Sequence, residues 1–152
     1  MDRSDLSSRD GLVRHVGLAF LLALGFYVLF FNGLERYRVR RGPWLVTFAT
    51  QSNGVPSVTV AQPRLGVVHY SLVFAGETVP PMPAPQTLAF SQPTQRKVPF
   101  GRVLFLDTTF LPGTVTLELF GHVVEFLPRV LTIDKQEFRW LAETQQVVAR
   151  HH

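Results

Sequence analysis

The sequence predicts a mainly β protein: a single N-terminal transmembrane helix followed by a small antiparallel β-sandwich or barrel-like domain with a short C-terminal helix. Two observations lead to this fold class. An uncharged apolar run lies near the start of the 152 residues. The remainder consists of short runs in which apolar and polar residues alternate, separated by turn residues. Because no helical patterns alternate with these runs, a parallel α/β sheet is not expected.

The apolar run extends over residues 12–34 and carries no charge between residues 16 and 31. At about 1.5 Å per residue, a helix of this length spans roughly 34 Å, which is enough for a hydrocarbon core of about 30 Å. Its Leu, Phe and Val side chains each favour insertion by roughly 0.3–0.6 kcal/mol near the bilayer centre. The expected membrane-anchor residues are Val16, Leu18, Phe20, Leu21, Leu22, Leu24, Phe26, Leu29 and Phe30.

Two other interpretations of this run are a core helix and a cleaved signal peptide. A small domain has no room to surround a helix that is apolar on every face. A signal peptide needs small residues at its cleavage site, whereas bulky and then basic residues follow here, F-F-N-G-L-E-R-Y-R. We therefore expect an uncleaved anchor, on which Ala19 and Ala23 form a small-xxx-small pair that can seat another helix.

A cluster of arginines follows the anchor, in a juxtamembrane segment of residues 35–42. The formal net charge of +4 and the pI near 10.1 are compatible with nucleic acid or anionic lipid as a partner. Because the other basic residues are scattered along the chain, we expect the lipid bilayer as partner and no nucleic acid. The residues expected to face lipid headgroups are Arg36, Arg38, Arg40 and Arg41.

Two signals disagree about the side of the membrane on which the β domain lies. In the N-terminal tail, residues 1–11, arginines are mixed with aspartates, whereas the flank after the anchor has a denser set of arginines. The positive-inside rule therefore favours a cytoplasmic domain by a small margin. An N-terminal anchor before a β domain more often tethers that domain outside the cytoplasm, so we expect the exoplasmic or periplasmic side.

The β domain is expected over residues 43–134, beginning where Gly42-Pro43 interrupts the helical pattern. Large apolar residues fall on one face of the first strand, and Asn53-Gly54 suits the turn of a hairpin. Turn signals every 8 to 12 residues or so are typical of a sandwich or barrel. The expected strands are Trp44–Thr50, 57–61, Val67–Ala75, 87–90, 102–106, Thr114–Leu119, 122–127 and 129–133.

A proline-rich stretch, residues 78–86, lies between the third and fourth of these strands. It cannot lie inside a sheet, because proline has no N–H to donate to a ladder. We expect an extended loop that either connects strands stiffly or docks in an aromatic groove of a partner. The possible partner-binding residues are Pro80, Pro81, Pro83 and Pro85.

The C-terminal segment, residues 135–152, is expected to contain a short helix. Asp134 followed by Glu137 has the spacing of a capping box. Phe138, Leu141 and Ala142 continue this pattern at helical spacing.

A search for catalytic or metal-binding patterns finds little. His69 and His122 lie on expected strands and, with Asp107 or Glu125, supply the residue types of a two-His, one-carboxylate metal site. No local spacing supports this site, and two half-exposed strand histidines explain the pattern better. The sequence has no Cys, no G-x-S-x-G and no phosphate-binding glycine loop. Asp107-Thr108-Thr109 follows an apolar strand, as in some acid/base sites, but a turn that closes the strand explains it equally well. We expect no cofactor.

These features favour a non-enzymatic accessory or assembly subunit of a larger membrane complex, with the helix and the β domain as docking surfaces. The alternative is a membrane-tethered binding module for a glycan, lipid or peptide. Phe100, Phe110 and Phe138 lie beside expected turns, where exposure would create an apolar patch that suits either function. Ordinary core packing explains most of these aromatic residues better. A small anchored enzyme that uses His69 or His122 with Asp107 is the third hypothesis. The expected partners are other membrane-protein subunits, and no small-molecule substrate is identified.

Overall fold

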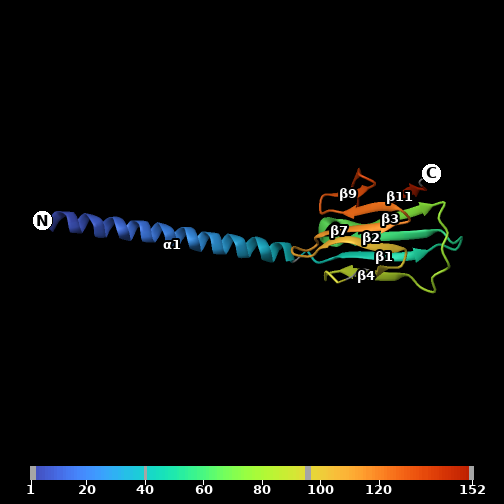
Figure 1. Ribbon diagram of the computed structural model, residues 1–152, viewed down its shortest axis with the longest axis horizontal. Coiled ribbons are helices and arrows are strands. Elements are labelled where there is room, and N and C mark those ends of the chain that lie inside the picture. The colour runs from blue at the N-terminus through green and yellow to red at the C-terminus, as the bar shows by residue number, and fades with distance from the viewer. Residues whose placement is uncertain (1–2, 40, 95–96, 151–152) are drawn as a thin grey trace. The chain divides into compact units, whose positions relative to one another are not determined.

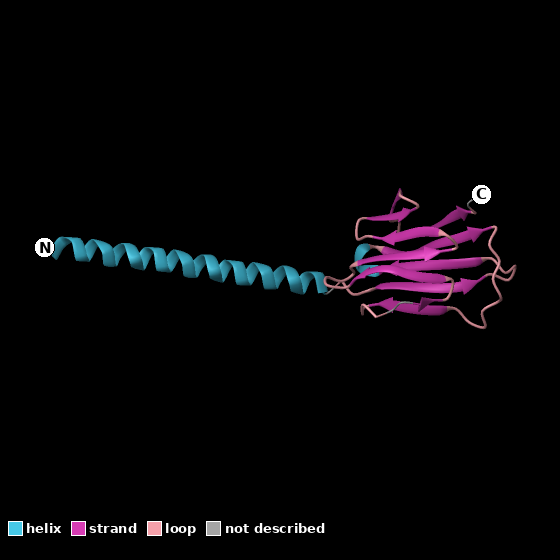
Figure 2. Ribbon diagram, in the orientation of Figure 1, coloured by secondary structure: helices cyan, strands magenta, loops and turns pink. Residues whose placement is uncertain are grey.

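The computed structural model describes residues 3–39, 41–94 and 97–150 (Figure 1). The chain divides into two compact units, Met1–Tyr37 and Arg38–His152. The first unit is helical and the second is built of strands (Figure 2). The predicted mainly β fold with one apolar N-terminal helix is therefore confirmed.

Helix α1 extends over Arg3–Val39 and is longer than the apolar run itself. It includes most of the expected N-terminal tail and the first part of the juxtamembrane segment, because no proline interrupts the pattern before residue 43. Gly42, with a φ of 73°, and Pro43 separate the helix from the first strand. The position of this break agrees with the sequence prediction.

The second unit is a β-sandwich of two sheets (Figure 1). One sheet has five strands in the order β11 (Glu143–Ala149), β3 (Val67–Ala75), β2 (Pro56–Gln62), β1 (Trp44–Thr50) and β4 (Gln86–Phe90). The other has six, in the order β10 (Gln136–Arg139), β9 (Val130–Ile133), β8 (His122–Phe126), β7 (Thr114–Leu119), β6 (Gly101–Asp107) and β5 (Lys97–Val98). All pairings are antiparallel except that of β11 with β3, which is parallel. A single 3₁₀ turn, η1 (Pro63–Leu65), connects β2 to β3.

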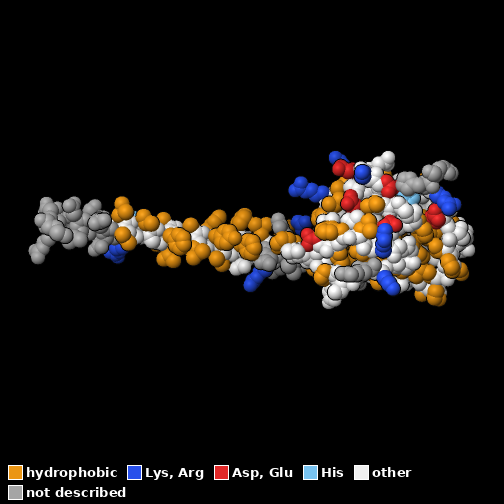
Figure 3. Space-filling model, in the orientation of Figure 1, with side chains coloured by type: hydrophobic (Ala, Val, Ile, Leu, Met, Phe, Trp, Pro, Cys, Tyr) orange, Lys and Arg blue, Asp and Glu red, His pale blue; other side chains and the backbone are white. Residues whose placement is uncertain are grey.

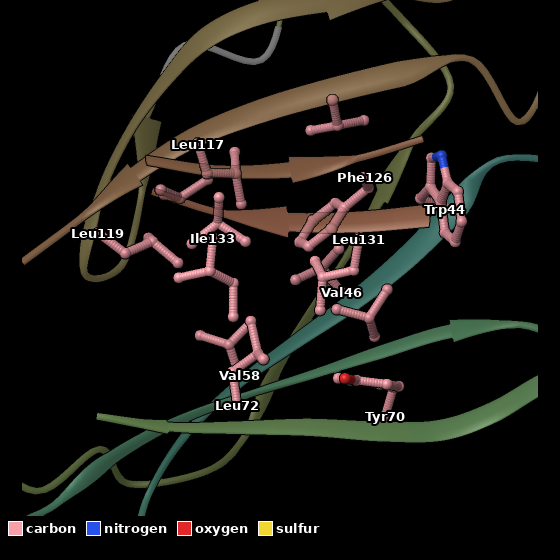
Figure 4. Close-up of a cluster of buried hydrophobic side chains, with 14 of the residues drawn as sticks. Trp44, Val46, Val58, Tyr70, Leu72, Leu117, Leu119, Phe126, Leu131 and Ile133 are labelled. Atoms are coloured by element: carbon pink, nitrogen blue, oxygen red, sulfur yellow. The ribbon is translucent and has the colours of Figure 1, made fainter. Parts of the chain in front are cut away.

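The core lies between the two sheets, and alternate residues of each strand point into it (Figure 4). On β1, Trp44, Val46 and Phe48 are fully buried, as the alternation predicts. Side chains of β7 and β8 meet them from the opposite sheet. Each fully buried side chain of this size contributes about 1.5–3 kcal/mol relative to an exposed one.

The predicted C-terminal helix is wrong, because two strands, β10 and β11, occupy this segment. Asp134 and Lys135 have φ values of 50° and 69°, which form a tight hairpin turn between β9 and β10. The Asp134 side chain accepts a hydrogen bond from the backbone N–H of Val123 on another strand. It therefore does not cap a helix of its own, and Phe138 packs against the sandwich core from β10.

The two ends of the sandwich differ in the loops that they carry. The proximal end is the end at which β1 begins, and strand register places four connections there, at 63–66, 108–113, 127–129 and 140–142. The distal end is the opposite end, with connections at 51–55, 76–85, 120–121 and 134–135. The proline-rich loop, coloured green to lime, therefore lies at the distal end (Figure 1).

Candidate functional site

Figure 3 shows an apolar surface along the middle of α1 on the face turned to the viewer, and the large apolar side chains between Leu12 and Leu34 are exposed. Within the part of the chain that the structure describes, Leu12–Leu34 is the one helical stretch long and apolar enough to cross a membrane, and none of it is buried. Two aromatic pairs stack along it, Phe26 with Phe30 and Tyr27 with Phe31, each with ring centroids 5.8 Å apart. The side chains expected in the anchor are all exposed, namely Val16, Leu18, Phe20, Leu21, Leu22, Leu24, Phe26, Leu29 and Phe30.

The expected headgroup-facing arginines divide between the two units. Arg36 is exposed near the end of α1, and Arg41 is half-buried at the start of the sandwich unit. Arg38 belongs to the helix, but its side chain lies outside the described residues, as does the whole of Arg40. The contact of these arginines with lipid stays a prediction.

At the proximal end, an aromatic cluster of Trp44, Tyr70, Phe126 and Trp140 holds the loops in place. The Trp44 and Trp140 ring centroids are 5.1 Å apart, and Tyr70 lies edge-on to Trp140 at 5.2 Å. The indole N–H of Trp44 donates to the carbonyl of Gly113 at 3.0 Å, and that of Trp140 donates to the carbonyl of Leu127 at 2.7 Å. These two bonds fix the 108–113 and 127–129 loops to the core.

The exposed surface of the proximal end is basic and apolar. Arg64 and Arg129 are exposed on two different connections, and Arg139 is exposed as the last residue of β10. Val68 and Leu141 expose 56% and 55% of their surface. The same end of the domain also holds a cavity of about 280 Å³. It is lined by Arg41, Asp107, Phe110, Leu111, Pro112, Gly113, Thr114 and Pro128.

A buried histidine–aspartate pair lies near the distal end. His122 Nδ1 is 2.6 Å from Asp134 Oδ2, and the His122 residue is only 2% exposed. Phe74 covers the imidazole, with ring centroids 6.0 Å apart. Both members of the pair line a cavity of about 310 Å³, together with Phe138 of β10 and residues 146–149 of β11. The prediction of a half-exposed His122 is therefore wrong.

The structure does not bring together His69, His122 and Asp107. His69 is exposed on β3 in the five-stranded sheet, whereas the other two belong to the six-stranded sheet. Asp107 pairs with the first residue of β7 and His122 with the last, which separates them by roughly 17 Å along the strand. Among the described residues, no group of three His, Cys, Asp or Glu side chains is placed to hold a metal ion.

The carboxylates considered in the sequence have local partners. Asp107 accepts the backbone N–H of Thr109 at 2.9 Å, and this bond holds the pKa of Asp107 below its ordinary value. Asp107 therefore closes its strand with a turn, which is the structural explanation that the sequence offered beside a role in a metal site. Glu125 accepts the hydroxyl of Thr132 at 2.6 Å.

The proline-rich loop is exposed at Pro80, Pro81, Pro83 and Pro85. Its first part is tied to the neighbouring hairpin turn by a bond from the N–H of Val79 to the carbonyl of Gly54. The loop lies outside the sheets, as the prolines predict. Its binding to a partner stays a prediction.

Phe100, Phe110 and Phe138 do not form an exposed aromatic patch, in agreement with the expectation that most of these residues pack in the core. All three are half-buried, Phe100 and Phe138 pack against the core, and Phe110 lines the proximal cavity. Instead, the exposed apolar residues of the sandwich are aliphatic, apart from Phe105 on β6.

Comparison with protein-family models, curated proteins and solved structures finds no match to this chain. Function is therefore inferred from the chain's own residues. The feature that the sequence concealed is Asp134 as the partner of His122. The two-residue turn Asp134-Lys135 joins β9 to β10, and the pairing of Ile133 with Val124 places it beside the start of β8.

Proposed function

We propose that this chain is a single-pass, membrane-anchored accessory or assembly subunit of a larger membrane protein complex. The observation that carries the proposal is the Leu12–Leu34 helix, whose large apolar side chains are exposed on every side. An exposed apolar surface of this extent requires cover, and a bilayer supplies it along the full length of the helix. The folded sandwich is then held at the membrane surface as a docking domain.

One face of the anchor helix has the shape of a helix-packing surface. Ala19 and Ala23 lie one turn apart, and the same spacing continues to Phe26 and Phe30. Two small residues let a second backbone approach closely, and the stacked phenylalanines extend the contact along the same seam. This combination supports a neighbouring transmembrane helix as partner, rather than lipid alone.

The experiment that tests this function is gentle detergent extraction of the full chain with crosslinking and mass spectrometry. We expect a reproducible set of membrane proteins to co-purify with the chain. Replacing Ala19 and Ala23 together by Ile should reduce this set several-fold, because the added branches hold the helices apart. The matched control replaces Gly17 and Gly25 by Ile. These glycines lie on a different face of the helix from Ala19 and Ala23, and a Cβ added at either glycine meets no atom within 4 Å. Recovery of the monomer alone would count against the subunit proposal.

The expected location of the sandwich is the exoplasmic or periplasmic side of the membrane. A reporter that is active on only one side of the membrane, fused after residue 152, tests this location directly. Reporter activity confined to the cytoplasm would reverse the orientation while leaving the subunit proposal intact.

A second candidate is a tethered binding module, with a peptide as the favoured ligand over a glycan or lipid. The observation in its favour is the cavity between β10 and β11, the outer strands of the two sheets. An extended peptide can add to such a sheet edge through its backbone and place alternate side chains in the cavity. Isolation of the chain with a peptide segment, rather than with membrane subunits, would favour this function.

A further inference from the structure

We propose that the proximal end of the sandwich is a second membrane contact, which binds anionic phospholipid headgroups of the bilayer that holds α1. The inference rests on the proposed function only in that α1 must lie in a membrane. It concerns a different surface, made of η1 and the loops 127–129 and 139–142. It assigns to this surface a partner of defined chemistry, the lipid phosphate.

The cationic part of this surface is three arginines from separate parts of the chain. Arg64 lies in η1, Arg129 between β8 and β9, and Arg139 at the end of β10. All three are exposed, and no ion pair joins them to a carboxylate within residues 3–39, 41–94 and 97–150. Figure 3 shows basic side chains in blue at this end of the domain.

Two described arginines elsewhere in the sandwich, Arg102 and Arg150, have carboxylate partners. Arg102 lies 2.6 Å from Glu118, and Arg150 lies 3.3 Å from Glu77. A guanidinium that is exposed without a protein carboxylate is available for a phosphate, with which it can form paired hydrogen bonds. Each arginine near an anionic membrane surface contributes about 1 kcal/mol of attraction.

The apolar part of the surface lies among these arginines. Val68 and Leu141 are more than half exposed, and the backbone at Val68 is joined to the 140–142 connection by a bond from the N–H of Val68 to the carbonyl of Ala142 at 2.9 Å. Trp140 lies next to Leu141 in the chain, half-buried and fixed by its bond to Leu127. Aliphatic side chains flanked by arginines, with a tryptophan beneath, are typical of surfaces that bind at the headgroup boundary.

The covalent link from the helix allows this contact. α1 ends at Val39 and β1 begins at Trp44, at the proximal end, so the link is residues 40–43. At no more than about 3.6 Å per residue, Trp44 lies within roughly 18 Å of the end of the helix. The short tether raises the effective concentration of the surface at the bilayer, so that weak contacts suffice.

Two carboxylates reduce the positive charge of the proximal end. Asp107 is held in its turn by the N–H of Thr109, whereas Glu143 is exposed at the start of β11. The remaining charge is still positive, because Arg41 adds to the three exposed arginines. Glu143→Gln should therefore strengthen the contact with anionic lipid.

The test uses the full chain reconstituted in vesicles. Because the sequence has no Cys, a single cysteine can carry a fluorophore at either end. Ala142→Cys marks the proximal end, and Ala84→Cys, also an exposed alanine, marks the distal end as the matched control. Quenching by headgroup-labelled lipid is measured in phosphatidylcholine vesicles with and without phosphatidylglycerol.

We expect quenching at position 142 to exceed that at position 84 several-fold in phosphatidylglycerol vesicles. High salt or the double variant R129Q/R139Q should remove most of this difference, since both weaken the attraction to phosphate. Equal quenching at the two positions, or no dependence on phosphatidylglycerol, would overturn the inference. Carbonate extraction of the same vesicles tests the anchor separately: loss of the chain from the vesicles would contradict the proposed function itself.

Discussion

Phe26 of α1 and Phe48 of β1 are identical side chains in opposite surroundings, the first 70% exposed and the second fully buried. In the sandwich, apolar residues alternate with polar ones, so each strand turns one face toward the opposite sheet. In the helix they occupy every face, so no arrangement of the helix on one protein surface can cover them all. The apolar side chains of the sandwich are therefore covered internally, by the opposite sheet, whereas those of the helix require an external cover such as a bilayer.

The largest expected effect comes from removing the internal cover. Trp44→Ala should lower the free energy of unfolding of the sandwich by about 3–5 kcal/mol, because it empties a fully buried site between Phe126 and Trp140. It also leaves the Gly113 carbonyl without the indole N–H. Denaturant unfolding followed by the fluorescence of Trp140 measures the loss. Retention of the chain by membranes should not change. A decrease in the free energy of unfolding below about 1 kcal/mol would show that neighbouring side chains repack into the space left by the indole.

A charge in the helix tests the external cover. Leu22→Arg should cost about 3–4 kcal/mol of insertion free energy near the bilayer centre, because the cost of the arginine adds to the lost contribution of the leucine. The variant should be released from membranes by carbonate in a much larger fraction than the wild type. Leu22→Ala is the matched control for loss of the side chain alone. Unfolding of the sandwich should be unchanged, and full membrane retention of Leu22→Arg would argue against a transmembrane position.

A smaller effect is expected at the buried polar pair. Asp134→Ala should destabilise the sandwich by about 1–3 kcal/mol, because the buried His122 loses this carboxylate and the N–H of Val123 loses its acceptor. Alanine is also strained at a φ of 50°, whereas Asp134→Asn tolerates that φ and should cost less. Glu137→Ala, at an exposed position nearby, should stay within about 0.5 kcal/mol of the wild type. Equal midpoints for all three variants would contradict a structural role for the pair.

The smallest effect is a pH dependence at Asp107. The N–H of Thr109 lowers its pKa in the folded state, so the carboxylate stabilises the fold at pH values above its unfolded pKa of about 3.9. This stabilisation disappears as the pH falls through the folded pKa. Asp107→Asn should therefore be slightly less stable than the wild type at neutral pH and equal to it in strong acid. Denaturant midpoints measured across this range, with Glu137→Gln at an exposed position as control, test the sign.

Local sequence patterns predict the parts of the fold whose cause is local. The anchor run, the Gly42-Pro43 break and the alternating strands from Trp44 to Ile133 all follow from the order of residues. β11 escaped prediction because its inward positions include Thr144 and Gln146, so no apolar alternation marks it. Its partner, β3, is about half the chain away in sequence, and a pairing of that separation leaves no local sign.

The candidate sites were less predictable than the fold. His122 lies in the predicted strand, but its partner Asp134 is also the first residue of a pattern that resembles a helix cap. Only the pairing of β8 with β9 brings the two side chains together. The arginines of the proximal end are scattered in the sequence, and strand register gathers Arg64, Arg129 and Arg139 at one end. The number of charges can be read from the sequence, but which of them are neighbours depends on the strand topology.

The parallel pairing of β11 with β3 has a consequence for the time course of synthesis. β3 is complete at Ala75, whereas its outer neighbour begins at Glu143. At translation rates of about 5–20 residues per second, the outer edge of β3 lies open for roughly 3–14 s after it leaves the ribosome. By then the Leu12–Leu34 segment has long been available to the insertion machinery. With this segment as the proposed anchor, the nascent chain would reach the membrane before its sandwich can close. An unpaired strand edge would be available in the interval to chaperones or to a neighbouring chain.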